Sequence, residues 1–262
     1  MTMMQPHLPW AFLVSVAFIF GTLIGSFLNV VIFRVPKGDS ILWPNSHCPR
    51  CSTPLNWWEN IPLLSYVLLR GRCRTCHEAI SWRYPLVEGM TGVLWAGLMA
   101  QNGPSLQFLA QSALASVLIV IFWIDLDTML ILDVITLPGI VLGILYGGGF
   151  GLGWGPHIGA ALAGYAFFRL IEWGSERVLG VAGMGRGDAK LAALMGAWLG
   201  PSGLAIALLI AFGLGSIVGI YLRMRAGESQ PYPFGPSLVV GALISLFVGQ
   251  TLWSWYLRMV WG

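Results

Sequence analysis

The sequence predicts an all-α polytopic membrane protein of about eight transmembrane helices, with a small insert that holds four cysteines. Hydrophobic residues make up 56% of the 262-residue chain and charged residues only 10%, whereas a soluble domain carries about 25% charged residues. The apolar residues gather in long runs, and about 20 such residues cross a bilayer as a helix. All four cysteines lie together in the one long polar stretch.

The first apolar run, residues 8–33, predicts a transmembrane helix rather than a cleavable signal, because no Lys or Arg precedes it and a signal core has only about 7–15 residues. We therefore expect a first transmembrane helix at 1–33, a cysteine-containing insert at 34–85 and a membrane domain at 86–262. Of the expected spans, the second and the sixth are short for a bilayer. The eight are 9–33, 86–100, 105–124, 134–150, 157–173, 189–200, 203–222 and 235–256.

Basic residues gather in alternate connections, which predicts the orientation of the chain in the membrane. Seven of the 14 Lys and Arg residues lie between the first two expected spans. The connections at 101–105, 147–157 and 200–203 contain no charged residue. Because basic loops stay on the cytoplasmic side, we expect the insert to be cytoplasmic and both termini to be periplasmic. The seven residues are Arg34, Lys37, Arg50, Arg70, Arg72, Arg74 and Arg83.

The cysteines form two CxxC pairs, Cys48/Cys51 and Cys73/Cys76. Four thiolates from two such pairs are the ligand set of a structural zinc ion with tetrahedral geometry. The expected cytoplasmic location is reducing, which favours Zn²⁺ over disulfides. Such a site has no open position, so its role would be to fold the insert. A redox or disulfide role and free thiols are the alternatives.

Two aspartates stand at the edges of apolar segments, where an ionisable group is costly and a functional site is the first hypothesis. Asp125 ends the apolar run 115–124, and Asp188 closes the glycine-rich stretch 183–188 just before another run. Side by side, two carboxylates cannot both ionise easily, so one can draw a proton from water while the other donates to a carbonyl oxygen. Gly185 and Gly187 would leave room for a substrate backbone.

Two further aspartates, Asp127 and Asp133, lie near the same expected membrane face. The simpler interpretation of Asp127 is a helix-end residue in interfacial water. Asp133 and Asp188 fit helix N-caps, because Asp accepts hydrogen bonds from backbone N–H groups at helix starts. For Asp188 the neighbouring glycines make a cap an incomplete explanation.

Motifs along nearly the whole chain resemble those of the type IV prepilin peptidases, bacterial inner-membrane aspartyl proteases of the GxGD kind. GxGD alone is a weak signal, whereas the set together is specific. The chain departs from the family at Leu132, where the family usually has proline. The matching segments are 25–34, 44–51, 58–62, 65–66, 73–76, 83–88, 124–127, 136–138, 183–190 and 233–236.

The resemblance implies a reaction and its residues. These enzymes cut the basic leader from type IV prepilins or type II secretion pseudopilins, typically between Gly and Phe, and many methylate the new N-terminus with S-adenosylmethionine. By motif, the catalytic residues are Asp125 and Asp188. Asp127 and Asp133 are supporting candidates, together with Gly185 and Gly187.

The site of the methyl donor S-adenosylmethionine is not predictable from spacing, because no GxGxxG motif follows an expected strand. The cysteine insert is a candidate region. It contains or adjoins the polar residues Glu59, Asn60 and Glu88, for which a solvated surface is the simpler expectation.

Two rival functions remain open from the residues alone. One is a transporter-like protein that uses intramembrane aspartates as a proton relay, and the other is a membrane scaffold with a zinc insert. We expect the lipid bilayer and prepilin or pseudopilin substrates as partners, and no nucleic acid.

Overall fold

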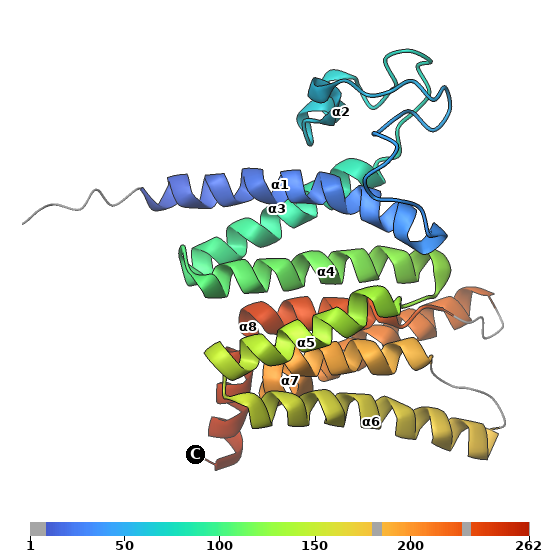
Figure 1. The fold of residues 1–262 in the computed structure, drawn as a ribbon. Coiled ribbons are helices and arrows are strands. Elements are labelled where there is room, and N and C mark those ends of the chain that lie inside the picture. Colours follow the sequence, from blue (N-terminus) through green and yellow to red (C-terminus); the bar gives the residue numbers. More distant parts are fainter. Residues whose placement is uncertain (1–8, 180–184, 227–231, 262) are drawn as a thin grey trace, which may run out of the picture. The chain divides into compact units, whose positions relative to one another are not determined.

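The computed structural model describes residues 9–179, 185–226 and 232–261. These residues form α-helices and short 3₁₀ helices, with no strand among them (Figure 1). The chain divides into two compact units, Met1–Ser116 and Val117–Gly262, and the division falls within helix α4. Gly183 and Met184, in the predicted glycine-rich stretch, lie outside the described residues.

The first unit contains two long helices, α1 (Trp10–Arg34) and α3 (Arg83–Asn102), and the insert between them. Their backbones approach closely at Gly21 and Gly25, because a Cβ on either residue would lie under 3 Å from the Cα of Gly92 or Glu88. The insert has only short elements: η1 (Val35–Lys37), η2 (Trp57–Asn60) and α2 (Leu64–Leu68).

Five helices form the second unit, in part or whole: α4 (Leu106–Thr128), α5 (Asp133–Phe150), α6 (Trp154–Leu179), α7 (Arg186–Ala226) and α8 (Gly235–Trp261). Helix α7 is central, since α5, α6 and α8 all pack against it. Small residues allow this packing. The Trp198 indole N–H donates to the Gly139 carbonyl oxygen over 2.8 Å, in the contact between α7 and α5.

Helix α7 contains both the sixth and the seventh expected spans. Gly200, whose φ of 68° is not helical, separates them. Five helices of the described chain are long and apolar enough to cross a membrane. Helices α3 and α6 are not among them, because their mean hydropathy over a membrane-length window is too low. The all-α membrane fold is therefore confirmed, whereas the count of eight spans stays a prediction.

Candidate active site

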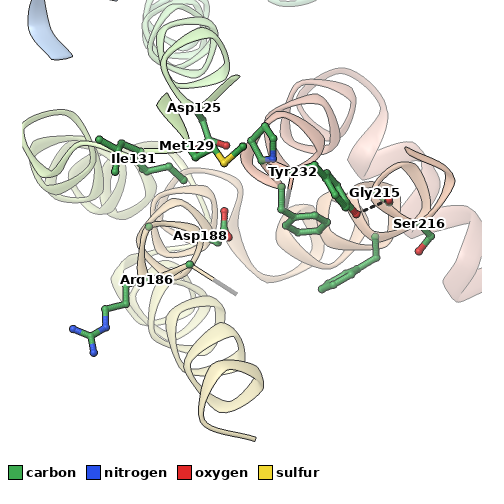
Figure 2. A pocket seen from close by; sticks show the side chains of 14 residues that line it. Asp125, Met129, Ile131, Arg186, Asp188, Gly215, Ser216 and Tyr232 are labelled. Carbon is green, nitrogen blue, oxygen red and sulfur yellow. Dashed lines mark hydrogen bonds between the residues drawn. The ribbon is translucent and has the colours of Figure 1, made fainter. Parts of the chain in front are cut away.

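Asp125 and Asp188 line the same cavity in the second unit, about 660 Å³ in volume. Asp125 lies in the last turn of α4 and is 4% exposed, and Asp188 lies in the first turn of α7 and is 8% exposed. Figure 2 shows both carboxylates directed into the cavity from different helices. They are close enough for their charges to interact. The cavity therefore holds two buried carboxylates that come from different helices.

The start of α8 approaches Asp125. Gly235 is the first residue of this helix, and a Cβ there would lie 2.3 Å from Oδ2 of Asp125. That oxygen is buried and accepts no hydrogen bond from any residue that the structure describes. The positive end of the α8 dipole favours a carboxylate at this position. Gly235 was not predicted as a site residue, although it lies in the motif 233–236.

The turn before α7 positions Asp188. Its backbone N–H donates to the Gly185 carbonyl oxygen over 3.1 Å, and its carboxylate stands in the first turn, where a helix dipole stabilises negative charge. Gly185 lines the cavity. Gly187 instead packs on Ile131 in the α4–α5 turn, because a Cβ at Gly187 would lie 2.9 Å from the Cβ of Ile131.

Arg186 also stabilises the turn before α7, through an ion pair outside the cavity. Figure 2 shows its side chain directed away from the two aspartates. Its Nε lies 3.4 Å from Oε1 of Glu172 in α6, which is 6% exposed. Arg169 pairs with the same carboxylate. Glu172 therefore ties the beginning of α7 to α6, a role that no motif indicated.

Neither Asp127 nor Asp133 lines the cavity. Both are exposed. Asp133 is the first residue of α5, whereas the N-cap position belongs to Leu132, and the Asp133 carboxylate forms an ion pair with Lys190 of α7. The N-cap interpretation of Asp133 is therefore wrong, because an ion pair between helices engages the side chain instead.

Aromatic and aliphatic side chains form the rest of the wall. The rings of Phe212 and Phe234 lie 5.3 Å apart, and the Tyr232 hydroxyl donates to the Gly215 carbonyl oxygen over 2.8 Å. Met129 reaches the cavity from a left-handed backbone position with φ of 54°. Such a wall accepts apolar side chains of a substrate, next to the two carboxylates.

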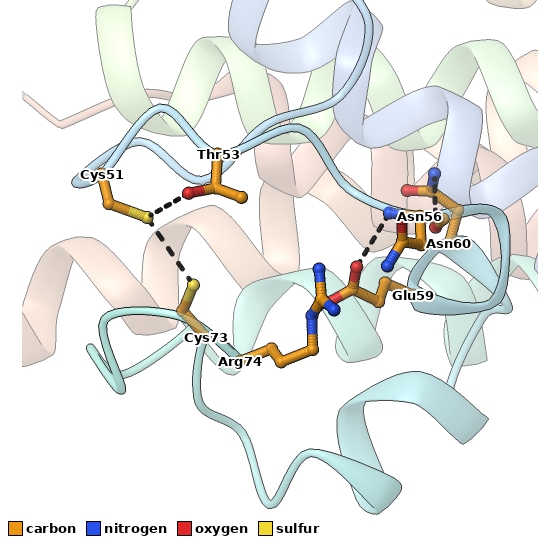
Figure 3. A network of polar contacts seen from close by, with 7 residues as sticks. All are labelled: Cys51, Thr53, Asn56, Glu59, Asn60, Cys73 and Arg74. Carbon is orange, nitrogen blue, oxygen red and sulfur yellow. Dashed lines mark hydrogen bonds and ion pairs between the residues drawn. The ribbon is translucent and has the colours of Figure 1, made fainter.

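In the first unit, the Sγ atoms of Cys48, Cys51, Cys73 and Cys76 lie within 4.8 Å of one another. The Cys48–Cys76 Sγ distance is 3.8 Å. The Cys51–Cys73 Sγ distance is 3.9 Å (Figure 3). A zinc ion with Zn–S bonds of about 2.3 Å sets the sulfur atoms of a tetrahedron about 3.8 Å apart. All four are free cysteines. The donor set fits zinc, and the spacing does not fit disulfides.

The two CxxC pairs have the same local fold, although their sequences share little beyond the cysteines. In each, the first cysteine donates its N–H to the carbonyl oxygen five residues later, Thr53 in one and Glu78 in the other. The residue after each second cysteine is left-handed, with φ of 56°. Hydrogen bonding with Thr53 lowers the pKa of the Cys51 thiol to about 6, whereas desolvation and the other three thiols raise the pKa of Cys76 to about 12. A metal that binds all four sulfur atoms would therefore have to displace protons.

Glu59 and Glu88 are buried, so the expectation of a solvated surface is wrong for both. The Asn56 N–H donates to Oε2 of Glu59 over 2.8 Å, and Arg74 lies 3.3 Å from Oε1 of the same residue (Figure 3). Glu88 accepts from the Leu63 N–H over 2.8 Å. Both carboxylates thus stabilise the backbone of the insert. Asn60 is exposed, as expected.

Sequence comparisons extend over almost the whole chain. Residues 19–102 match the bacterial peptidase A24 N-terminal domain, and residues 112–220 match the type IV leader peptidase family. A protein of Aeromonas salmonicida (strain A449) is 39% identical, with 97% of this chain and 96% of the relative covered. One of Neisseria gonorrhoeae is 37% identical, with 94% and 95% covered. Both are named prepilin leader peptidase/N-methyltransferase. No solved structure gives a significant match.

Proposed function

Since this chain belongs to the type IV leader peptidase family, we propose that it removes the leader peptide of type IV prepilins or type II secretion pseudopilins and then methylates the new N-terminus. The observation that carries the proteolytic part is the pair of buried carboxylates in one cavity, Asp125 and Asp188. The name shared by the relatives of this chain, prepilin leader peptidase/N-methyltransferase, supports both activities.

In the proposed mechanism, the two aspartates share one proton. The ionised carboxylate draws a proton from the attacking water, and the protonated one donates to the oxygen of the scissile carbonyl. Burial favours this sharing, because two negative charges in a poorly solvated cavity repel each other. The N-terminus of α8 beside Asp125 and the first turn of α7 around Asp188 would hold the carboxylates in place.

The supporting residues have separate proposed roles. Gly185 leaves the cavity open beside Asp188, and Gly187 allows the α4–α5 turn to approach. Asp133 would fix α5 against α7 through Lys190. Asp127 is exposed at the end of α4, where its charge could attract a basic leader peptide.

We propose an inner-membrane protein with the cysteine insert and the active site on the cytoplasmic side and both termini in the periplasm. The distribution of Lys and Arg supports this orientation. A prepilin carries an apolar helix that resides in the bilayer, and the apolar wall of the cavity suits a substrate delivered from the membrane.

The four cysteines would hold a structural Zn²⁺ ion, which supplies folding free energy to the insert. S-adenosylmethionine would supply the methyl group, and we assign it no residues. We propose the division predicted from sequence, with the insert at 34–85 between the first membrane helix, 1–33, and the membrane protease part, 86–262. The peptidase residues themselves all belong to the unit Val117–Gly262.

A cleavage assay with a purified prepilin tests the dyad. We expect Asp125→Asn and Asp188→Asn each to lower kcat at least about 100-fold, because each removes one partner in proton transfer. Glu176→Gln, which changes an exposed carboxylate of α6 outside the cavity, is the matched control and should retain cleavage within severalfold. Near wild-type cleavage by either dyad variant would exclude the assignment.

A further inference from the structure

The short helix α2 exposes an apolar face to its surroundings. Leu64, Val67 and Leu68 have the i, i+3 and i+4 spacing of residues on one side of a helix. They are 51%, 70% and 64% exposed. Trp57 in η2 is also exposed, at 81%. Exposed apolar side chains that share one face of a helix, as on α2, can mark a contact with a protein or a membrane.

Contacts of Leu63 fix the depth of α2 along the membrane helices of the same unit. Its N–H donates to Oε2 of Glu88 over 2.8 Å. Glu88 lies against Gly25 of α1, since a Cβ on Gly25 would be 2.7 Å from the Glu88 Cα. Gly25 precedes Arg34, the last residue of α1, by nine residues, or about 13 Å along the helix axis at 1.5 Å per residue.

This depth places α2 beside the spanning part of α1. The headgroup region on each side of a bilayer is only about 5–8 Å thick, whereas α1 is part of a candidate span that continues to Lys37. Figure 1 shows α2 level with the C-terminal half of α1 rather than beyond its end. Apolar residues that are exposed on the protein surface at this level would therefore face lipid.

Leu63, the residue before α2, connects the face of α2 to an exposed apolar position of α3. A Cβ on Gly89 would lie 3.8 Å from the Leu63 side chain, which therefore covers this position of α3. Val93, four residues further on the same side of α3, is 63% exposed. An apolar strip thus runs from α3 onto α2 without a polar interruption at Gly89.

Next to this face lies a basic cavity of about 670 Å³. Leu68 belongs to both the face and the cavity wall. Arg74 in the wall is paired with Glu59, whereas Arg70 and Arg72 form no ion pair within the part of the chain that the structure describes. The wall consists of Leu68, Leu69, Arg70, Arg72, Cys73, Arg74 and His77.

We propose that α2 is an interfacial helix, which inserts Leu64, Val67 and Leu68 into the leaflet around the end of α1 and binds the headgroup of an anionic phospholipid at Arg70 and Arg72. A phospholipid joins acyl chains to a phosphate, and the structure places an apolar face beside two uncompensated guanidinium groups. One guanidinium group can bind two oxygens of a phosphate at the same time. These two contacts would fix the position of the zinc insert relative to the membrane surface.

Photocrosslinking in the full chain tests the membrane contact. The photoreactive residue p-benzoylphenylalanine replaces Val67, the protein is placed in nanodiscs of phosphatidylcholine and phosphatidylglycerol, and lipid adducts are measured by intact-protein mass spectrometry. The control position is Thr75, an exposed polar residue between Cys73 and Cys76. We expect at least tenfold more lipid adduct at 67 than at 75. Equal yields, or crosslinks from 67 to protein alone, would refute the insertion of α2.

The composition of the adducts tests the headgroup site. We expect phosphatidylglycerol to be enriched over its share of the nanodisc, and Arg70→Gln with Arg72→Gln to reduce this enrichment about fivefold or more. Zinc content serves as the folding check, and Arg70→Gln alone, which leaves Arg72 next to Cys73 unchanged, replaces the double variant if zinc is lost. Unchanged enrichment overturns the headgroup site. Loss of enrichment on adding inorganic phosphate would instead indicate a site for free anions.

Discussion

At the scale of residues, the environment of Asp125 depends on a glycine far away in the chain. Gly235 allows the α8 N-terminus to approach the carboxylate, and no larger residue fits without moving it. Asp188 has a different kind of support, from the turn that its own sequence forms around Gly185. One aspartate is thus positioned by tertiary packing and the other by local structure.

Gly235→Ala should impair cleavage without unfolding the protein. The new Cβ would lie 2.3 Å from Oδ2 of Asp125, so the carboxylate must move by more than about 1 Å, a displacement that can reduce turnover about 100-fold. We expect this reduction in kcat, measured with a prepilin substrate, with little change in KM.

The control for this variant is Gly213→Ala in α7. A Cβ at Gly213 meets no atom within 4 Å, and alanine favours a helix more than glycine does. Cleavage by this variant should equal wild type. A Gly235→Ala protein with wild-type kcat would show that the approach of α8 does not position Asp125.

At the scale of elements, the apolar runs predicted most helices within a few residues, because about 20 apolar residues in succession have few alternatives in a membrane. The ends of the helices were less predictable. Asp125 was expected just beyond the third span, yet α4 continues to Thr128. The sixth and seventh spans were separated correctly at Gly200, where the structure has the non-helical break.

The candidate site was predictable where local sequence determines it. Asp125 and Asp188 were identified because a carboxylate beside an apolar run is unusual. Gly235 and Glu172 were not, because their roles arise from contacts with residues far away or in another helix. Glu88 was expected at the surface, since the sequence does not show that the Leu63 N–H needs a partner.

The turn between α4 and α5 accommodates the departure from the family at Leu132. This residue has φ of −81° and ψ of 129°, close to the φ of −65 ± 15° that proline requires. We therefore expect Leu132→Pro to retain cleavage and to stabilise the protein by about 0.4–1 kcal/mol through a less flexible unfolded chain, measured as resistance to denaturant.

Met129→Pro, three residues earlier, is the contrasting variant. Its φ of 54° excludes proline, and its N–H donates to the Asp125 carbonyl oxygen over 2.8 Å. This change should destabilise the protein and reduce cleavage. If Leu132→Pro were as damaging as Met129→Pro, the backbone at Leu132 would differ from the one described.

At the scale of the whole molecule, we expect the insert to depend on a bound metal for its stability, whereas the helical units have packed cores of their own. Its elements are short, so it has little core, and the free energy of zinc binding would serve as folding free energy. We expect one zinc per chain by metal analysis. Cys73→Ser should lose most of it and become sensitive to proteolysis within the insert.

Thr75→Ser, between the second pair of cysteines, keeps all four ligands and should keep both the metal and the resistance to protease. Absence of metal from the unmutated protein would remove the zinc assignment. Protease resistance in a metal-free Cys73→Ser protein would show that the insert folds without the ion.

The close approach of α1 and α3 lowers the entropy cost of folding for the segment that connects them. Residues 35–82 leave one helix and return to another that is already packed against it at Gly21 and Gly25. Joining the ends of a flexible segment of this length costs about 3 kcal/mol of chain entropy, and the packing of α1 against α3 offsets that cost in the folded protein. An isolated peptide of the same sequence would lack the packed helix pair. Metal binding alone would then have to offset the entropy cost of folding it.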